Sequence, residues 1–103
     1  KMLSSSALQV NGKIFIDEGA EKAVKSGKSI LPAGILKTEG SYNKGDLIYI
    51  VDSENKIIGK GLSHYNNNEV NLVKKMRSDK IEKVLGYRGK DEIIHIDDFV
   101  LEN

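Results

Sequence analysis

The chain of 103 residues carries 16 lysine and arginine residues and 15 aspartate and glutamate residues, which leaves a formal net charge of +1. Hydrophobic residues make up 39% and charged residues 30%, a composition that fits one folded globular domain and is too apolar for intrinsic disorder. The near-neutral charge provides no global field toward nucleic acid or membrane, and the absence of cysteine excludes disulfides and thiol catalysis. Any polyanion would have to bind at a local basic patch.

No apolar stretch of the chain is long enough for a membrane span, and its first residues lack the apolar region of a signal peptide. The chain begins at Lys1, which indicates a processed or excised piece of a longer protein. We therefore expect residues 1–11 to be the edge of a preceding region and residues 12–103 to form one domain. We also expect a cytoplasmic protein with no membrane partner, because the lack of cysteine fits a reducing compartment.

Turn residues interrupt the chain at short intervals, a pattern typical of short strands. The first expected strand covers residues 12–17, and it is followed by a helix that Asp17 caps and Gly27 ends. The apolar face of this helix consists of Ala20, Ala23 and Val24. The next apolar segment, residues 29–35, contains the only proline of the chain, so it should be a bend or a sheet edge.

A β-hairpin is expected in the middle of the chain. Residues 47–51 are apolar on both alternating faces, which predicts a strand that is covered on both sides. Residues 57–62 form the return strand, in which Gly59 and Gly61 indicate a bulge, a barrel corner or a close backbone approach. Residues 66–68 are expected to follow as a polar loop.

A second helix is expected toward the C-terminal end, where Ser78 is a suitable N-cap and Gly86 ends the helix. Its buried residues should be Ile81, Val84 and Leu85. Residues 93–95 and 99–101 are expected to close the chain as short strands. The predicted fold class is mixed α+β, mainly β: a small barrel of short strands with two short helices packed outside it.

The segment Ser26-Gly27-Lys28-Ser29 has the ending of a phosphate-binding loop. The full motif needs a glycine five positions before Gly27, where Lys22 stands, and it leads from a strand into a helix. Here the segment is expected to end a helix. We therefore interpret it as a helix stop followed by a solvated lysine.

The two histidines, His64 and His95, are distant in sequence and do not provide the three or four ligands of a zinc site. His95 is followed by Asp97, and this pair is expected to fix the end of a strand by hydrogen bonds. We assign no catalytic, cofactor-binding or metal-binding residue to the chain.

Basic residues provide one candidate surface for RNA or for docking. Its members are Lys22, Lys25, Lys28, Lys37 and Lys60. The first three lie on or just after the first expected helix, and the turn at Pro32 could bring them near Lys37 or Lys60. Glu18 and Glu21 flank the same helix, so the charge pattern favours a solvated surface over a nucleic-acid interface.

Four blocks of sequence occur in an order and spacing that match those of a known domain family. They are Ile-Asp-Glu-Gly-Ala at 16–20, Gly-Lys-Ser-Ile-Leu-Pro-Ala-Gly-Ile at 27–35, Gly-Leu at 61–62, and Leu-Gly-Tyr at 85–87 followed by Asp-Glu-Ile-Ile-His at 91–95. Over residues 12–101 the chain resembles the C-terminal PUA domain of bacterial glutamate 5-kinases. Met2 stands where this family usually has tryptophan and Ile96 where it usually has arginine, so an ion pair of that arginine has no counterpart at Ile96.

The resemblance implies a PUA-like pseudo-barrel and an accessory domain, which we expect to dock on the kinase domain of the same protein and its oligomer. The parent enzymes phosphorylate the side-chain carboxylate of glutamate in proline biosynthesis. Their ATP and magnesium would bind in a separate kinase domain, so this domain should have no catalysis and no cofactor of its own. PUA domains also resemble RNA-binding modules, which leaves weak RNA binding as the alternative. An exposed apolar patch would favour docking, and lysines clustered beside the turn at 31–34 would favour RNA.

Overall fold

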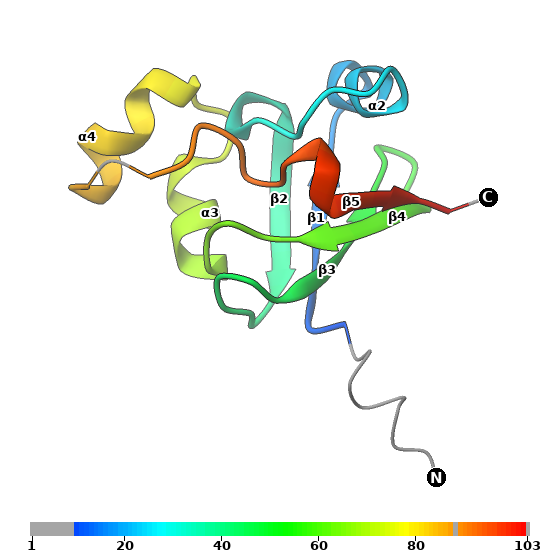
Figure 1. Ribbon diagram of the computed structural model, residues 1–103, viewed down its shortest axis with the longest axis horizontal. Helices are drawn as coiled ribbons and strands as arrows, with labels where there is room; N and C mark the ends of the chain where they lie inside the picture. Colours follow the sequence, from blue (N-terminus) through cyan, green and yellow to red (C-terminus); the bar gives the residue numbers. More distant parts are fainter. Residues whose placement is uncertain (1–9, 88, 103) are drawn as a thin grey trace, which may run out of the picture.

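The computed structural model describes residues 10–87 and 89–102, which form a five-stranded sheet with helices beside it (Figure 1). The strands are β1 (Gly12–Ile16), β2 (Ile35–Gly40), β3 (Leu47–Val51), β4 (Ile57–Leu62) and β5 (Phe99–Leu101). The helices are α2 (Glu18–Lys25), α3 (Asn67–Val73) and α4 (Ile81–Leu85), and short 3₁₀ turns cover Pro32–Gly34, Ser78–Lys80 and Ile96–Asp98. The expected fold class, mixed α+β and mainly β, is confirmed. Of the expected edge segment, residues 1–11, residues 1–9 with Met2 lie outside the described part of the chain.

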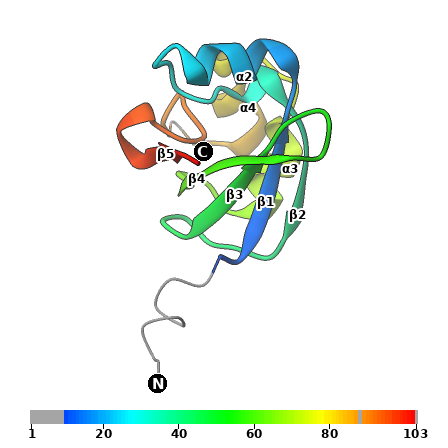
Figure 2. The ribbon, with the colours of Figure 1, turned by 90° about the vertical axis from the view of Figure 1, so that its right-hand side faces the viewer.

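The sheet has the strand order β2-β1-β3-β4-β5. β1 runs parallel to β3, and the other neighbouring strands are antiparallel. The register shifts between Phe15 and Ile16 against β2, and between Ile50 and Val51 against β4. Such irregularities increase twist and bend the strands, which lets the sheet curve around one hydrophobic core (Figure 2).

The core consists mostly of β-branched side chains, which pack well on a pleated sheet. Its buried members are Ile14, Ile16, Val24, Ile30, Ile35, Tyr42, Ile48, Ile50, Ile58, Tyr65, Val70, Val73, Ile81, Ile93 and Ile94. Burial of one such aliphatic side chain contributes about 1.5–3 kcal/mol relative to its exposure. The core therefore draws on every part of the chain from β1 to the segment before β5.

Both expected ends of α2 are confirmed. The Asp17 carboxylate accepts a hydrogen bond from the backbone amide of Ala20 at 2.7 Å. At the other end Gly27 has a φ of +90°, and the amide of Lys28 donates to the carbonyl of Ala23 at 2.9 Å. This is a helix C-terminal cap of the Schellman type. The segment 26–29 therefore ends a helix as expected, and its geometry is not that of a phosphate-binding loop.

The prediction of a polar loop at residues 66–68 is wrong, because α3 begins in this segment. The Asn66 side chain accepts from the amide of Glu69 at 2.8 Å, and the Glu69 carboxylate accepts from the amide of Asn66 at 3.0 Å. This capping box was visible in the sequence as Asn-x-x-Glu. The apolar residues that follow at helical spacing, Val70 and Val73, are buried.

The expected second helix is present as a 3₁₀ turn, Ser78–Lys80, that continues into α4. Ser78 is not its cap, since the Ser78 hydroxyl donates to the carbonyl of Asp91 at 3.2 Å. Val84 was expected in the core but is 37% exposed. The prediction of a short strand at residues 93–95 is also wrong. Ile94 makes only an isolated antiparallel bridge with Ile30, which is not a strand of the sheet.

The expected hairpin of β3 and β4 is confirmed, with one face more open than predicted. Ile48 and Ile50 lie in the core, and Val51 is buried on the opposite face. Leu47 and Tyr49 on that opposite face are only half-buried. Their neighbours on β4 are themselves near the surface, so the first part of this face stays open to solvent.

Gly59 allows β5 to approach β4 closely. A Cβ atom at this position would lie 2.5 Å from the carbonyl oxygen of Val100 and 2.6 Å from the Phe99 ring. Real side chains do not tolerate such distances, so the backbone approach expected from this glycine is confirmed.

Candidate functional site

The five lysines of the candidate surface are spread over separate elements. Lys22 and Lys25 lie on α2 and Lys28 follows it, whereas Lys37 lies on β2 and Lys60 on β4. β2 and β4 are separated by β1 and β3 in the sheet. The structure therefore brings together the three lysines near α2 and keeps the two strand lysines apart.

Carboxylates neutralise part of this charge. Lys25 Nζ lies 2.8 Å from Glu21, and this hydrogen bond and the Glu21 charge raise the pKa of Lys25 above its usual value. On the strands, Lys37 Nζ lies 3.3 Å from Glu39 and Lys60 Nζ lies 3.9 Å from Glu102. Exposed pairs of this kind add little stability, but they reduce the positive potential available to a polyanion.

A shallow groove of about 240 Å³ runs between α2 and the turn at Pro32–Gly34. Its lining residues are Asp17, Gly19, Ala20, Ala23, Ser29, Leu31, Ala33 and Gly34. The backbone packs tightly here, since the amide of Asp17 donates to the carbonyl of Gly34 at 2.9 Å. The lining carries one carboxylate and no lysine, so the groove suits an apolar group better than a phosphate.

The strand register places a second set of side chains on the face of the sheet that points away from the core. Lys13, Tyr49, Lys60 and Val100 lie side by side in one row across β1, β3, β4 and β5. We call these four residues, together with Leu47, Ile57 and Leu62, the outer sheet face. Val100 is 62% exposed and Leu62 is 41% exposed.

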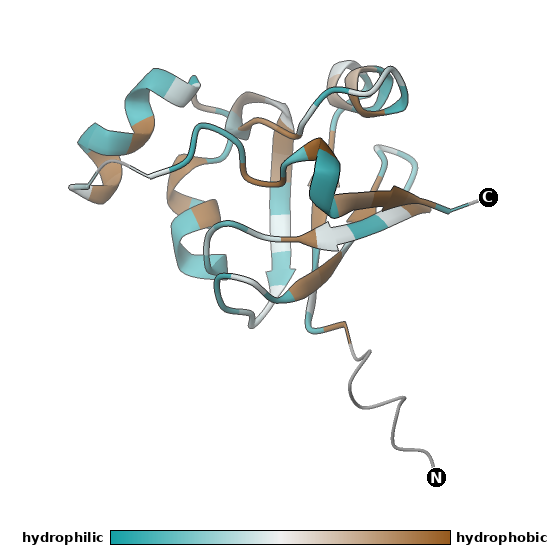
Figure 3. Cartoon of the chain, viewed as in Figure 1, coloured by the Kyte–Doolittle hydropathy of each residue, from teal (hydrophilic) through white to brown (hydrophobic). Residues whose placement is uncertain are grey.

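The strands on both sides of β4 are largely apolar in sequence. Apolar segments of β3 and β5 lie on either side of β4 in Figure 3. At one end of the face, Lys37 Nζ lies 4.5 Å from the centre of the Phe15 ring and covers it. The rest of the outer sheet face mixes exposed apolar side chains with two lysines, because Lys60 stands between Tyr49 and Val100.

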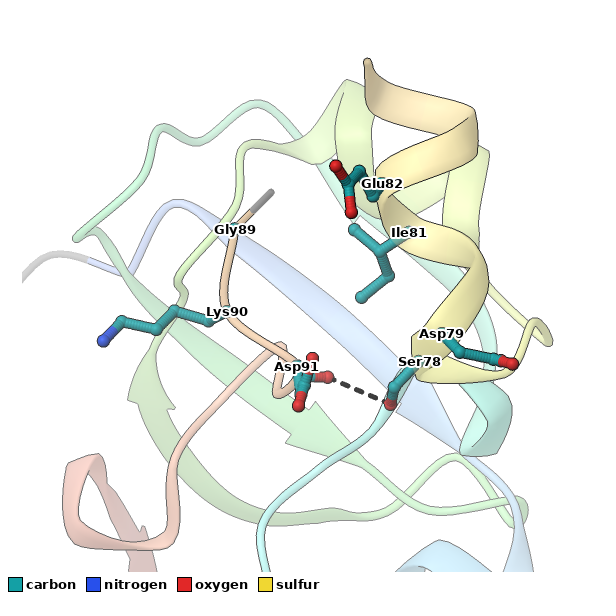
Figure 4. Close-up of a pocket in the computed structure, with 7 residues that line it drawn as sticks. All are labelled: Ser78, Asp79, Ile81, Glu82, Gly89, Lys90 and Asp91. Carbon is teal, nitrogen blue, oxygen red and sulfur yellow. Dashed lines mark hydrogen bonds between the residues drawn. The ribbon is translucent and has the colours of Figure 1, made fainter. Parts of the chain in front are cut away.

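A cavity of about 330 Å³ lies between α4 and residues 89–91 (Figure 4). Its lining residues are Ser78, Asp79, Ile81, Glu82, Gly89, Lys90 and Asp91. The bond from Ser78 to the Asp91 backbone closes its base. Within residues 10–87 and 89–102, no group of three histidine, cysteine, aspartate or glutamate side chains is arranged to hold a metal ion.

The histidines are separate and have structural partners. His64 Nε2 lies 3.2 Å from the Asp98 carboxylate, and its Nδ1 is buried without a partner. His95 Nδ1 accepts from the amide of Asp97 at 3.0 Å and caps the 3₁₀ turn before β5. His95 and Asp97 were expected to fix the end of a strand, but His95 caps the 3₁₀ turn Ile96–Asp98 that precedes β5.

The profile of the PUA domain family matches residues 12–85, from the first strand to the end of α4. The chain belongs to the PUA domain family. Among the described residues of this PUA domain, no helix is both long and apolar enough to cross a membrane.

Curated relatives share this domain at substantial identity. A glutamate 5-kinase of Thermoanaerobacter sp. (strain X514) is 49% identical over 94 residues, which are 90% of this chain and 25% of that protein. A glutamate 5-kinase of Paramagnetospirillum magneticum is 38% identical over 96 residues, 93% of this chain and 26% of that protein. The chain thus spans about a quarter of the length of these relatives.

Solved structures confirm the fold. A PUA domain protein from Aeropyrum pernix superimposes with a TM-score of 0.57 at 18% identity, over 85% of this chain and 45% of that chain. A conserved PUA domain protein from Thermoplasma acidophilum gives 0.56 at 25% identity, over 82% and 48%. An archaeal box H/ACA sRNP Nop10–Cbf5 complex gives 0.56 at 21% identity, over 94% of this chain and 25% of that chain.

Proposed function

We propose that this PUA domain is a non-catalytic accessory part of a glutamate 5-kinase, and that its outer sheet face packs against the rest of that enzyme. The relatives at 38–49% identity support the choice of enzyme. In the proposed parent, phosphate transfer from ATP to glutamate, with magnesium, takes place in a separate kinase part in the cytoplasm. The PUA domain then acts on assembly or regulation.

The outer sheet face is the observation that carries the docking proposal. Leu62, Tyr49 and Val100 are contributed by three neighbouring strands and leave apolar surface in water. Removal of apolar surface from water contributes about 25 cal/mol per Å². Lys13 and Lys60 lie in the same row as Tyr49 and Val100, so the surface that covers this face should combine apolar residues with acidic ones opposite the two lysines.

The proposed occupant is the remainder of the same polypeptide. About three-quarters of each glutamate 5-kinase relative lies outside the match to this chain, since the match covers 25–26% of its length. A covalently linked partner is present at high effective concentration, so a modest apolar face is enough for stable docking. Assembly of the whole oligomer would follow from the same contact.

RNA binding is the alternative, and the charges support it less well. Lys25 is paired with Glu21, and the groove beside α2 has no lysine in its lining. Binding of the RNA backbone without recognition of its bases depends on several lysine or arginine side chains that converge on one RNA strand. The archaeal box H/ACA sRNP Nop10–Cbf5 complex is 21% identical to this chain, and that likeness supports the fold and not RNA binding.

Hydrogen exchange on the full-length enzyme tests the docking proposal. Amides in residues 57–62 and 99–101 should exchange at least about tenfold more slowly in the full-length enzyme than in the 103-residue chain, while residues 81–85 of α4 should not differ. Leu62→Glu with Val100→Glu should remove this extra protection. The matched pair Leu72→Glu with Val84→Glu, exposed residues on α3 and α4, should keep it. Equal exchange in the full-length enzyme and the separate chain would refute docking through this face.

A further inference from the structure

Asn11 and Gly12 form a reactive pair at the point where β1 begins. Asn11 is the only asparagine in the 103-residue sequence that a glycine follows. In such a pair the backbone nitrogen of the glycine can attack the side-chain amide carbon of the asparagine, because glycine has no Cβ atom to block the approach. Asn11 is also exposed, so water reaches its side chain.

The fold itself requires glycine at position 12. A Cβ atom there would lie 2.5 Å from the ring of Tyr42 and 2.7 Å from the carbonyl oxygen of Glu39. Tyr42 is a buried member of the core and Glu39 lies on β2, so neither can move away without disturbing close-packed structure. The packing of β1 therefore keeps a reactive glycine beside an exposed asparagine.

Two hydrogen bonds position Asn11. Its side-chain Nδ2 donates to the Asp46 carboxylate at 3.2 Å, and its backbone amide donates to the carbonyl of Leu47 at 3.2 Å. These bonds join the start of β1 to the start of β3, at the lower end of the sheet in Figure 1. The side-chain bond must open before the reaction, and at an exposed site water replaces the lost partner. Strand ends also open more readily than strand centres, which frees the Gly12 nitrogen.

We propose that Asn11 is a site of spontaneous covalent modification, in which its side chain is deamidated through a cyclic imide. The Gly12 nitrogen forms a bond to the side-chain amide carbon of Asn11, and the side-chain nitrogen leaves as ammonia with the proton that the Gly12 nitrogen gives up. Water then adds to one of the two ring carbonyls, and the bond from that carbonyl to the Gly12 nitrogen breaks. Attack at the side-chain carbonyl gives aspartate, and attack at the backbone carbonyl gives isoaspartate.

Either product introduces a negative charge where a hydrogen-bond donor stood. The Asp46 carboxylate then faces a second carboxylate in place of Nδ2, and the two like charges repel. Asp46 also accepts from the backbone amide of Asn43 at 2.8 Å, which holds it in the turn. Isoaspartate adds a carbon atom to the backbone and so disturbs the bond from position 11 to Leu47. The modification should therefore loosen the start of β1 from the start of β3.

The modified side chain would border the outer sheet face. A surface hollow of about 290 Å³ is lined by Asn11 together with Lys13, Glu39 and Tyr49, among others. Lys13 and Tyr49 belong to the outer sheet face, so a carboxylate at position 11 would reduce the positive potential at this end of it. The modification does not depend on docking, because it involves only Asn11, Gly12 and water.

Incubation of the folded 103-residue chain at mildly alkaline pH, followed by digestion with pepsin at acid pH and mass mapping of the peptides, tests the proposal. Asn11 should lose its amide at least about tenfold faster than Asn43 and Asn55, exposed asparagines that are followed by lysine. Both aspartate and isoaspartate should appear at position 11, since direct hydrolysis of the amide gives aspartate alone. Asn11→Gln keeps an amide but makes the five-membered ring impossible, so position 11 should then stay unmodified.

Hydrogen exchange measures the structural consequence. In the modified fraction, separated by anion exchange, the amides of residues 11–13 should exchange at least about fivefold faster than in the unmodified chain, while residues 81–85 of α4 should not differ. Asn11→Asp should act in the same direction. Asn55→Asp adds the same charge at an exposed turn and is the control, which should leave residues 11–13 unchanged. The proposal is overturned if Asn11 keeps its amide as long as Asn43 does, if aspartate is the only product, or if Asn11→Gln is modified as fast as the wild type. Equal exchange in the modified and unmodified chains would refute the loosening of β1.

Discussion

The Asp17 carboxylate accepts a hydrogen bond from the amide of Ala20 at 2.7 Å and thereby caps α2 at the point where β1 ends. Asp17→Ala leaves an amide of the first turn unsatisfied and should lower the free energy of unfolding by about 1 kcal/mol. Urea denaturation monitored by circular dichroism measures this loss. Glu18→Ala removes an acidic residue of the same turn that does not cap the helix, and it should cost less than half as much. Equal losses would mean that general charge, and not the cap, is what matters.

Substitution by alanine should have opposite effects on stability at two glycines, Gly59 and Gly19. Gly59→Ala places a Cβ atom 2.5 Å from the carbonyl oxygen of Val100, so β4 and β5 must separate. Such overpacking should destabilise the domain by about 1–3 kcal/mol. Gly19→Ala on α2 meets Asp17 at 3.5 Å, an ordinary contact, and should stabilise the helix by up to about 1 kcal/mol. Thermal denaturation of the two variants checks the pair, and a loss of stability in both would contradict this account of Gly59.

Stability should fall at alkaline pH because the folded chain keeps tyrosines neutral. Burial raises the pKa of Tyr42 from 10.0 to about 12, and the hydrogen bond to Glu69 raises the pKa of Tyr87 to about 12. A raised folded-state pKa contributes stability that is fully present below the unfolded pKa and is lost as the pH rises through the folded pKa. The free energy of unfolding should therefore decrease between pH 10.0 and about 12.

Urea denaturation at a series of alkaline pH values measures this decrease. The double variant Tyr42→Phe with Tyr87→Phe lacks both ionisations, so its stability should fall less steeply over the same interval. An identical slope in the wild type and the double variant would show that other groups control the alkaline loss.

The separate domain should have no glutamate-dependent ATP turnover. The segment 26–29 is a helix cap with Gly27 at a φ of +90°, and the described residues hold no metal-binding cluster. A coupled ADP assay with glutamate and magnesium should give the rate of a mock preparation. Turnover that disappears in Lys28→Ala would contradict the accessory role.

Generic RNA should bind no better than weakly, with a Kd of roughly 10⁻⁴ M or higher at physiological salt, because the cations near α2 are few and partly paired. Fluorescence anisotropy with a labelled single strand, repeated over a salt series, measures the affinity. Lys22→Glu with Lys25→Glu should change it little. Micromolar binding that this double reversal abolishes would replace the docking proposal with RNA binding.

Local signals were sufficient for several elements and for the class of the domain. Asp17 and Gly27 act on the few residues around them, so both ends of α2 were predictable. The hairpin of β3 and β4 was predictable for the same reason, since its strands are neighbours in the chain. α3 was also encoded locally, by Asn66 and Glu69, and was missed because three consecutive asparagines were interpreted as a loop.

The tertiary structure decided which surfaces exist. β1 pairs with β3 in parallel, and this long-range contact places Lys13 beside Tyr49 on the outer sheet face. Strand order separates Lys37 from Lys60, although sequence alone allowed them to meet. The fold also brings Lys44 and Lys90, which are nearly half the chain apart, to one surface cavity. Side-chain periodicity specifies which residues share a face of one helix or strand. Which distant strands pair depends on the sum of many weak contacts over the whole chain, so no short stretch of sequence determines it.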